Sequence, residues 1–76
     1  MAGLPVISGK EAVKAFQKSG WEIKRIGSSR HIILKKESTS VTLSVPDHKV
    51  LDRGLLRSLI RDALLTVDAF CKLLED

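Results

Sequence analysis

The sequence has few of the residues that support covalent cross-links, metal clusters or base stacking. Its one cysteine, Cys71, cannot form an internal disulfide and has no second cysteine with which to share a metal. Because Cys71 lies in an apolar stretch, we expect a buried thiol. Only three aromatic residues occur, which argues against a protein that stacks successive bases on rings: Phe16, Trp21 and Phe70.

Long hydrophobic runs and several well-known motifs are also missing. No run approaches the roughly 18 apolar residues of a membrane span, and residues 1–8 lack the charged start and apolar core of a signal peptide. We therefore expect a cytoplasmic protein that does not enter membranes. The sequence contains no G-x-x-x-x-G-K-[ST], G-x-G-x-x-G, G-x-S-x-G or H-E-x-x-H motif, so nucleotide-binding, serine-hydrolase and zinc-protease functions lack support.

A metal site near His48 is the remaining cofactor hypothesis. Asp47 and Asp52 flank this histidine, but Asp52 suits a helix cap and Asp47 suits a turn. We therefore expect neither a bound metal nor an organic cofactor.

The composition predicts one small basic domain over residues 1–76. The chain has 76 residues, of which 43% are hydrophobic and 29% charged, as in ordinary globular proteins. Thirteen lysines and arginines exceed nine acidic residues, which gives a net charge of +4. Residues 1–61 carry 12 basic and 5 acidic groups, whereas residues 62–76 carry 1 and 4. This balance favours a polyanionic partner such as RNA or DNA.

Local patterns predict a helix followed by three strands. Ser8 and Glu11 form a capping box that starts the helix, and Gly20 ends it. Strands are predicted over 21–26, 30–36 and 41–45, with a polar hairpin loop over 37–40 and a turn over 27–29. A symmetric hairpin places Leu34 opposite Leu43 and pairs the buried side chains Ile32 and Val45 on the same face.

Two further helices complete the predicted α+β fold. Asp52 caps the first, whose buried face comprises Leu56, Leu59, Ile60 and Ala63. Thr66 caps a short final helix with Val67, Phe70, Cys71 and Leu74 on one face. The helix that starts at Ser8 and the helix that Asp52 caps both need an apolar surface to pack against. We therefore expect them to cover the Ile32 face of an antiparallel sheet and to leave the other face open.

The same register places His31 on the open face, opposite Pro46. His48 follows two residues later, so we expect the two histidines to approach one another at one edge of the sheet. Two imidazoles beside an arginine can act as general base and general acid in RNA cleavage, because RNA supplies its own 2′-hydroxyl nucleophile. A histidine at a strand start can equally be an ordinary hydrogen-bonded residue.

The order of the motifs resembles the HicA-type toxin family over nearly the whole chain. The similar segments are LPVISGKE at 4–11, SGW at 19–21, HIILK at 31–35, VPDH at 45–48 and GLLRSLIRDA at 54–63. The resemblance implies a fold like the double-stranded-RNA-binding domain, with a helix, a three-stranded antiparallel sheet, a helix and a short C-terminal helix. It also implies a type II toxin that cleaves mRNA in the cytoplasm without a metal and forms a hetero-oligomer with a HicB-type antitoxin.

Residue roles follow from the resemblance by position. It implies that His31 is the catalytic residue, and His48 and Arg30 are candidates for assistance. For His48 the roles of acid, phosphate ligand and structural turn residue remain open. The basic stripes supply candidate RNA contacts: Lys10, Lys14, Lys35, Arg53 and Arg57.

Four positions depart from the family's usual pattern. Ser29 and Arg30 precede the histidine in place of Gly-Ser or Gly-Thr, Leu55 replaces Thr after Gly54, and Leu64 replaces a common Gly. The alternative functions are a non-catalytic module that binds double-stranded RNA and a protein-interaction domain that uses the open sheet face.

Overall fold

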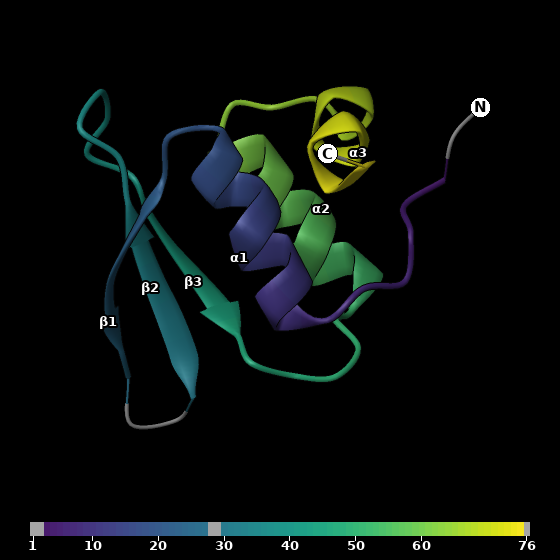
Figure 1. Cartoon of the computed structure of the whole chain (residues 1–76), viewed down its shortest axis with the longest axis horizontal. Helices are drawn as coiled ribbons and strands as arrows, with labels where there is room; N and C mark the ends of the chain where they lie inside the picture. Colours follow the sequence, from purple (N-terminus) through teal and green to yellow (C-terminus); the bar gives the residue numbers. More distant parts are fainter. Residues whose placement is uncertain (1–2, 28–29, 76) are drawn as a thin grey trace.

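The fold has two layers, a sheet and a set of helices that cover one of its faces (Figure 1). The computed structural model describes residues 3–27 and 30–75. Its elements are α1 (Gly9–Lys18), β1 (Glu22–Ile26), β2 (His31–Lys35), β3 (Thr42–Pro46), α2 (Arg53–Asp62) and α3 (Val67–Glu75). This order confirms the predicted α+β class and matches the double-stranded-RNA-binding-domain-like fold. Ser28 and Ser29, which we assigned to a turn, lie outside the described residues.

Helix α1 begins and ends as the sequence predicts. The Ser8 hydroxyl accepts a 3.1 Å hydrogen bond from the Glu11 N–H, and the Glu11 carboxylate accepts one of 2.9 Å from the Ser8 N–H. At the other end, Gly20 has φ +102°, the left-handed conformation that glycine adopts without a side-chain clash. The N–H groups of Gly20 and Trp21 then donate to carbonyls of the last helical turn, which completes the C-terminal cap.

The sheet is antiparallel, with strand order β1-β2-β3. The predicted pairing of β2 with β3 is confirmed, because Leu34 lies opposite Leu43 and Ile32 lies opposite Val45. These four side chains are buried, whereas the residues on the opposite face of the two strands are exposed or half-buried except Pro46, which is buried. Strands start or end one residue away from the predicted bounds at several places, as is usual for assignments from sequence.

Strand β1 contains a bulge that the sequence analysis did not foresee. Ile23 pairs with Leu34 and Arg25 pairs with Ile33, so Lys24 is an extra residue on β1. The bulge places Ile23 and Ile26 on the same face although they are three residues apart. That face is the one that the helices cover over β2 and β3.

Helices α2 and α3 also use the predicted caps. The Asp52 carboxylate accepts a 3.0 Å bond from the Leu55 N–H, and the Thr66 hydroxyl accepts one of 3.0 Å from the Ala69 N–H. Helix α2 ends at Asp62, and Leu64 then takes φ +61°. The bonds from Leu64 N–H to Arg61 O and from Leu65 N–H to Ile60 O form the same cap that Gly20 makes after α1.

One hydrophobic core joins the sheet to the helices. Helix α1 packs on β3 and β1, α2 packs on β3, and α3 packs on both helices. The rings of Phe16 and Phe70 meet with their centroids 5.0 Å apart, which ties α3 to α1. The expected burial of Cys71 is wrong, because this side chain is only half-buried, at the edge of the face that Phe70 buries. In the described part of the chain no helix has both the length and the apolar composition needed to cross a bilayer.

Candidate functional site

His31 begins β2 and lies on the face of the sheet that the helices leave open. The adjacent Ile32 is buried in the core, and strand alternation therefore turns His31 to the opposite side. The His31 imidazole is half-buried, and its backbone carbonyl accepts a 2.6 Å hydrogen bond from the Gly27 N–H. A histidine in this position is held by a strand and still accessible from solvent.

Backbone hydrogen bonds bring three segments together at this end of the sheet. The Asp47 N–H donates to the Arg30 carbonyl at 2.8 Å, which joins the residues that adjoin the two histidines. The Gly9 N–H, the first of α1, donates to the His48 carbonyl at 2.9 Å. The segment after β3 therefore passes the start of α1 on its way to α2 (Figure 1). His48 is exposed in this segment, and the two histidine-bearing segments meet at one end of the sheet, where His31 lies opposite Pro46. The close approach of the two imidazoles stays a prediction.

Arg30, immediately before His31, holds an unusual backbone conformation. Its φ is +59°, in the left-handed region that favours glycine, and its N–H donates to the Gly27 carbonyl at 3.1 Å. The Arg30 side chain is exposed, so a positive charge precedes His31 directly in the chain.

The other predicted contact residues are all exposed but lie in three different places. Lys35 shares the open face with His31 but ends β2, about 13 Å along the strand at 3.3 Å per residue. Arg53 and Arg57 lie on α2. Lys10 and Lys14 lie on α1 and line a groove between this helix and β1.

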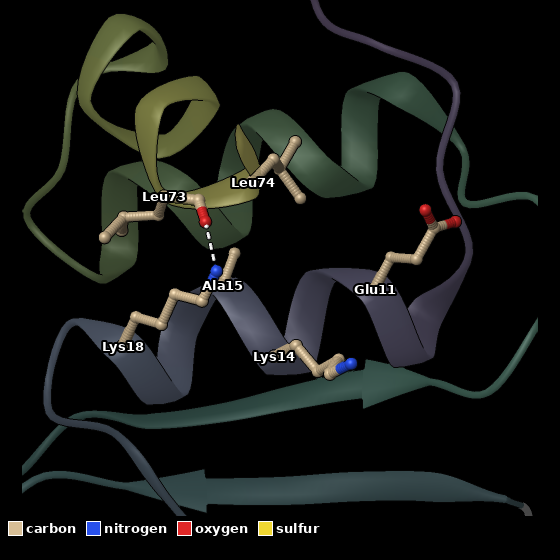
Figure 2. Close-up of a pocket in the computed structure, with 6 residues that line it drawn as sticks. All are labelled: Glu11, Lys14, Ala15, Lys18, Leu73 and Leu74. Atoms are coloured by element: carbon tan, nitrogen blue, oxygen red, sulfur yellow. Dashed lines mark hydrogen bonds between the residues drawn. The ribbon is translucent and has the colours of Figure 1, made fainter. Parts of the chain in front are cut away.

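A second cleft, of about 200 Å³, lies between α1 and α3 (Figure 2). Lys18 crosses it and donates a 2.9 Å hydrogen bond from Nζ to the Leu73 carbonyl. This bond satisfies a carbonyl of the last helical turn and supplies a favourable charge at the C-terminus of α3. The cleft therefore has a structural role, and in Figure 2 Lys14 leaves α1 on the side away from α3.

Two features of this region could not be predicted from the sequence. One is the close approach of Gly9 to β3, where a Cβ atom would overlap the Pro46 carbonyl oxygen. The other is the exposed pair Ile23 and Ile26, because the β1 bulge has no recognisable signal in the sequence. Both depend on how segments distant in the chain pack together.

These observations define a class: a small basic α+β domain whose open sheet face carries an accessible histidine beside an arginine. The family described as HicA toxin of bacterial toxin-antitoxin has a model that matches residues 9–65. The chain belongs to this family and is a toxin of a toxin–antitoxin system, which implies an antitoxin partner. Comparison with curated proteins and with solved structures gave no match.

Proposed function

We propose that this toxin is a metal-independent endoribonuclease that cleaves mRNA in the cytoplasm, with His31 as the general base. The observation that carries the proposal is the placement of His31 on the open sheet face, half-buried and next in the chain to the exposed Arg30, whose carbonyl is bonded to the segment that holds His48. Membership in the HicA toxin family supports it.

The chemistry needs few groups because RNA contains its own nucleophile. The His31 imidazole takes the proton of the 2′-hydroxyl, whose oxygen then forms a bond to the adjacent phosphorus. The bond to the 5′-oxygen breaks, and that oxygen receives a proton from an acid or from water. Arg30 stabilises the charge that develops on the phosphoryl oxygens, since an arginine offers several N–H donors to such a group.

Substrate binding in this proposal depends on charge rather than on base stacking. Lys35 lies on the same face as His31 and extends the positive surface along β2. Contacts of this kind reach phosphates, which carry no sequence information, so they orient RNA without selecting a sequence. Binding should therefore weaken as salt concentration rises.

The decisive experiment compares wild-type protein with the His31→Ala variant. Wild type should cleave mRNA in the presence of EDTA and arrest growth, whereas His31→Ala should lose both effects and keep its circular dichroism spectrum and melting temperature. Thr42→Ala, on an exposed residue at the far end of the sheet, is the matched control and should retain cleavage. Retained cleavage in His31→Ala, or cleavage that EDTA abolishes, would overturn the assignment.

The role of His48 can be resolved in the same assay. If His48 is the acid, His48→Ala should slow cleavage by about 10²–10⁴-fold, the usual contribution of general acid–base catalysis. If it binds phosphate, the variant should mainly raise KM. If it is a turn residue, the melting temperature should fall instead.

A non-catalytic module that binds double-stranded RNA is the second candidate function. The departure at Ser29 and Arg30 favours it, since a bulky charged residue occupies the position before His31. Salt-sensitive binding of duplex RNA by wild-type protein without cleavage or growth arrest would establish this alternative.

The antitoxin in this proposal is of the HicB type and forms a hetero-oligomer with the toxin. A partner that docks on the open sheet face covers His31 and blocks access of RNA. Co-expression of a HicB-type protein encoded beside this gene should restore growth, and growth arrest that persists would argue against that partner.

A further inference from the structure

The helices cover one face of the sheet over β2 and β3 but leave the same face of β1 exposed. All five residues of β1 are exposed, whereas the residues of β2 and β3 on the same face are buried. Ile23 is 44% exposed and Ile26 is 69% exposed, although the β1 bulge turns both toward the helix side. The helical layer therefore ends at α1, and two isoleucines extend beyond it.

These isoleucines form one wall of a groove of about 340 Å³ along α1. Val13 and Ile32 supply further apolar surface, and Lys10 and Lys14 lie at the helix side. The two lysines are four residues apart and thus share one face of α1. Of the described residues that line the groove, none is acidic. The groove combines an apolar lining with positive charge.

This combination favours a protein segment over RNA. Phosphates gain nothing from contact with isoleucine and valine side chains, and the described residues of the lining include no aromatic ring on which a base can stack. An added strand is also disfavoured, because the bulge at Lys24 breaks the regular edge of β1. A helix with an apolar face fits a groove that runs beside α1.

We infer that the groove between α1 and β1 binds an acidic amphipathic helix of the antitoxin. Apolar side chains of that helix pack against Ile23, Ile26 and Val13, and its carboxylates pair with Lys10 and Lys14. The inference rests on the proposed function only in taking the antitoxin as the source of the helix. Because Ile32 and His31 face opposite sides of β2, the helix anchors the partner without occupying the catalytic face.

The test uses a synthetic peptide of about 14 residues, or four helical turns, with leucines on one face and glutamates elsewhere. Added to the full chain, it should shift the amide NMR signals of Val13, Ile23 and Ile26, and its affinity should fall as salt rises. Ile26→Asp and Lys14→Glu should each weaken binding by about tenfold. Val50→Asp is the matched control, because Val50 is 60% exposed and does not line the groove.

Three results would overturn the inference. The first is that a peptide with lysine in place of glutamate binds as tightly as the glutamate peptide. The second is that Ile26→Asp and Val50→Asp bind the glutamate peptide with equal affinity. The third is that short duplex RNA displaces the peptide from the groove, which would assign the groove to RNA. Failure of the nuclease proposal is separately visible, because peptide binding is measured without RNA and should be unchanged in His31→Ala.

Discussion

Leu64 and Arg30 are the two non-glycine residues in the described part of the chain with positive φ, at +61° and +59°. A left-handed conformation brings the Cβ atom close to a carbonyl oxygen, at a cost of about 1–2 kcal/mol for L-residues. Neither side chain repays this cost by burial, since both are exposed. Each residue therefore stores strain that a glycine would relieve.

We predict that Leu64→Gly raises the free energy of unfolding by about 0.5–1 kcal/mol, the relieved strain less the entropy that glycine loses on folding. Leu64 is 84% exposed, so little apolar burial is lost. Urea denaturation of the two proteins measures the difference. Gly20→Ala is the reverse control, because Gly20 occupies the same cap position after α1. This variant should have a lower free energy of unfolding than wild type.

Arg30→Gly separates strain from charge at the proposed site. The backbone should gain stability for the reason given for Leu64. Loss of one exposed cation should slow RNA cleavage by about fivefold at low salt, equivalent to about 1 kcal/mol, and the difference should shrink at high salt. Arg30→Lys retains the charge but has fewer N–H donors, so its cleavage rate should lie between those of wild type and Arg30→Gly; equal rates for all three proteins would remove Arg30 from the mechanism.

At the scale of elements, the start of α1 is locked against the end of β3. Gly9 is buried, its N–H donates to the His48 carbonyl at 2.9 Å, and the Pro46 carbonyl lies where a Cβ atom would be. The capping box fixes where α1 begins, and the absence of a side chain at Gly9 fixes how close it comes to the sheet. The position of the His48 segment thus depends on a residue that performs no chemistry.

Gly9→Ala should destabilise the fold by about 1–3 kcal/mol, the usual cost of forcing extra volume into a packed site. The backbone carbonyl that the new methyl group meets cannot rotate away, so α1 must shift. Thermal denaturation followed by circular dichroism measures the loss. Gly3→Ala is the matched control, since a Cβ atom there meets nothing within 4 Å; equal melting temperatures for the two variants would contradict the proposed close contact.

At the scale of the whole molecule, a chain of 76 residues has little stability in reserve, about 4–11 kcal/mol. Helix α3 enlarges the core through Phe70, which packs on Phe16, and an exposed hydrogen bond from Lys18 to the Leu73 carbonyl also joins it to α1. Without α3, the buried face of α1 that carries Ala15 and Phe16 would meet water. The last helix is therefore part of the domain rather than an appendage.

Phe70→Ala should cost about 3–5 kcal/mol, which is the typical loss for a fully buried phenylalanine. Such a loss is a large share of the total, so we expect a much lower melting temperature and rapid proteolysis of α3. Cys71→Ala, at the half-buried neighbour, should change stability far less. A Phe70→Ala protein as stable as Cys71→Ala would show that α3 contributes little to the core.

Features set by neighbouring residues could be predicted from the sequence. The Ser8, Asp52 and Thr66 caps, the end of α1 at Gly20 and the pairing of Leu34 with Leu43 all appear in the structure. Capping depends on residues within one helical turn, and a hairpin register follows from strand alternation and loop length. Both features therefore depend on residues that are close together in the sequence. The placement of His31 on the open face follows from the same alternation.

Only the tertiary structure decided the features that depend on distant segments. These are the β1 bulge that exposes Ile23 and Ile26, the fit of Gly9 against Pro46, and the partial exposure of Cys71. Each arises because elements far apart in the chain must pack at close distance. The positive φ of Arg30 and of Leu64 belongs to local turns, but non-glycine residues rarely adopt this conformation, so only the structure revealed it. The sequence alone determined which side of the sheet carries His31, and packing determined how its surroundings and the groove beside α1 are shaped.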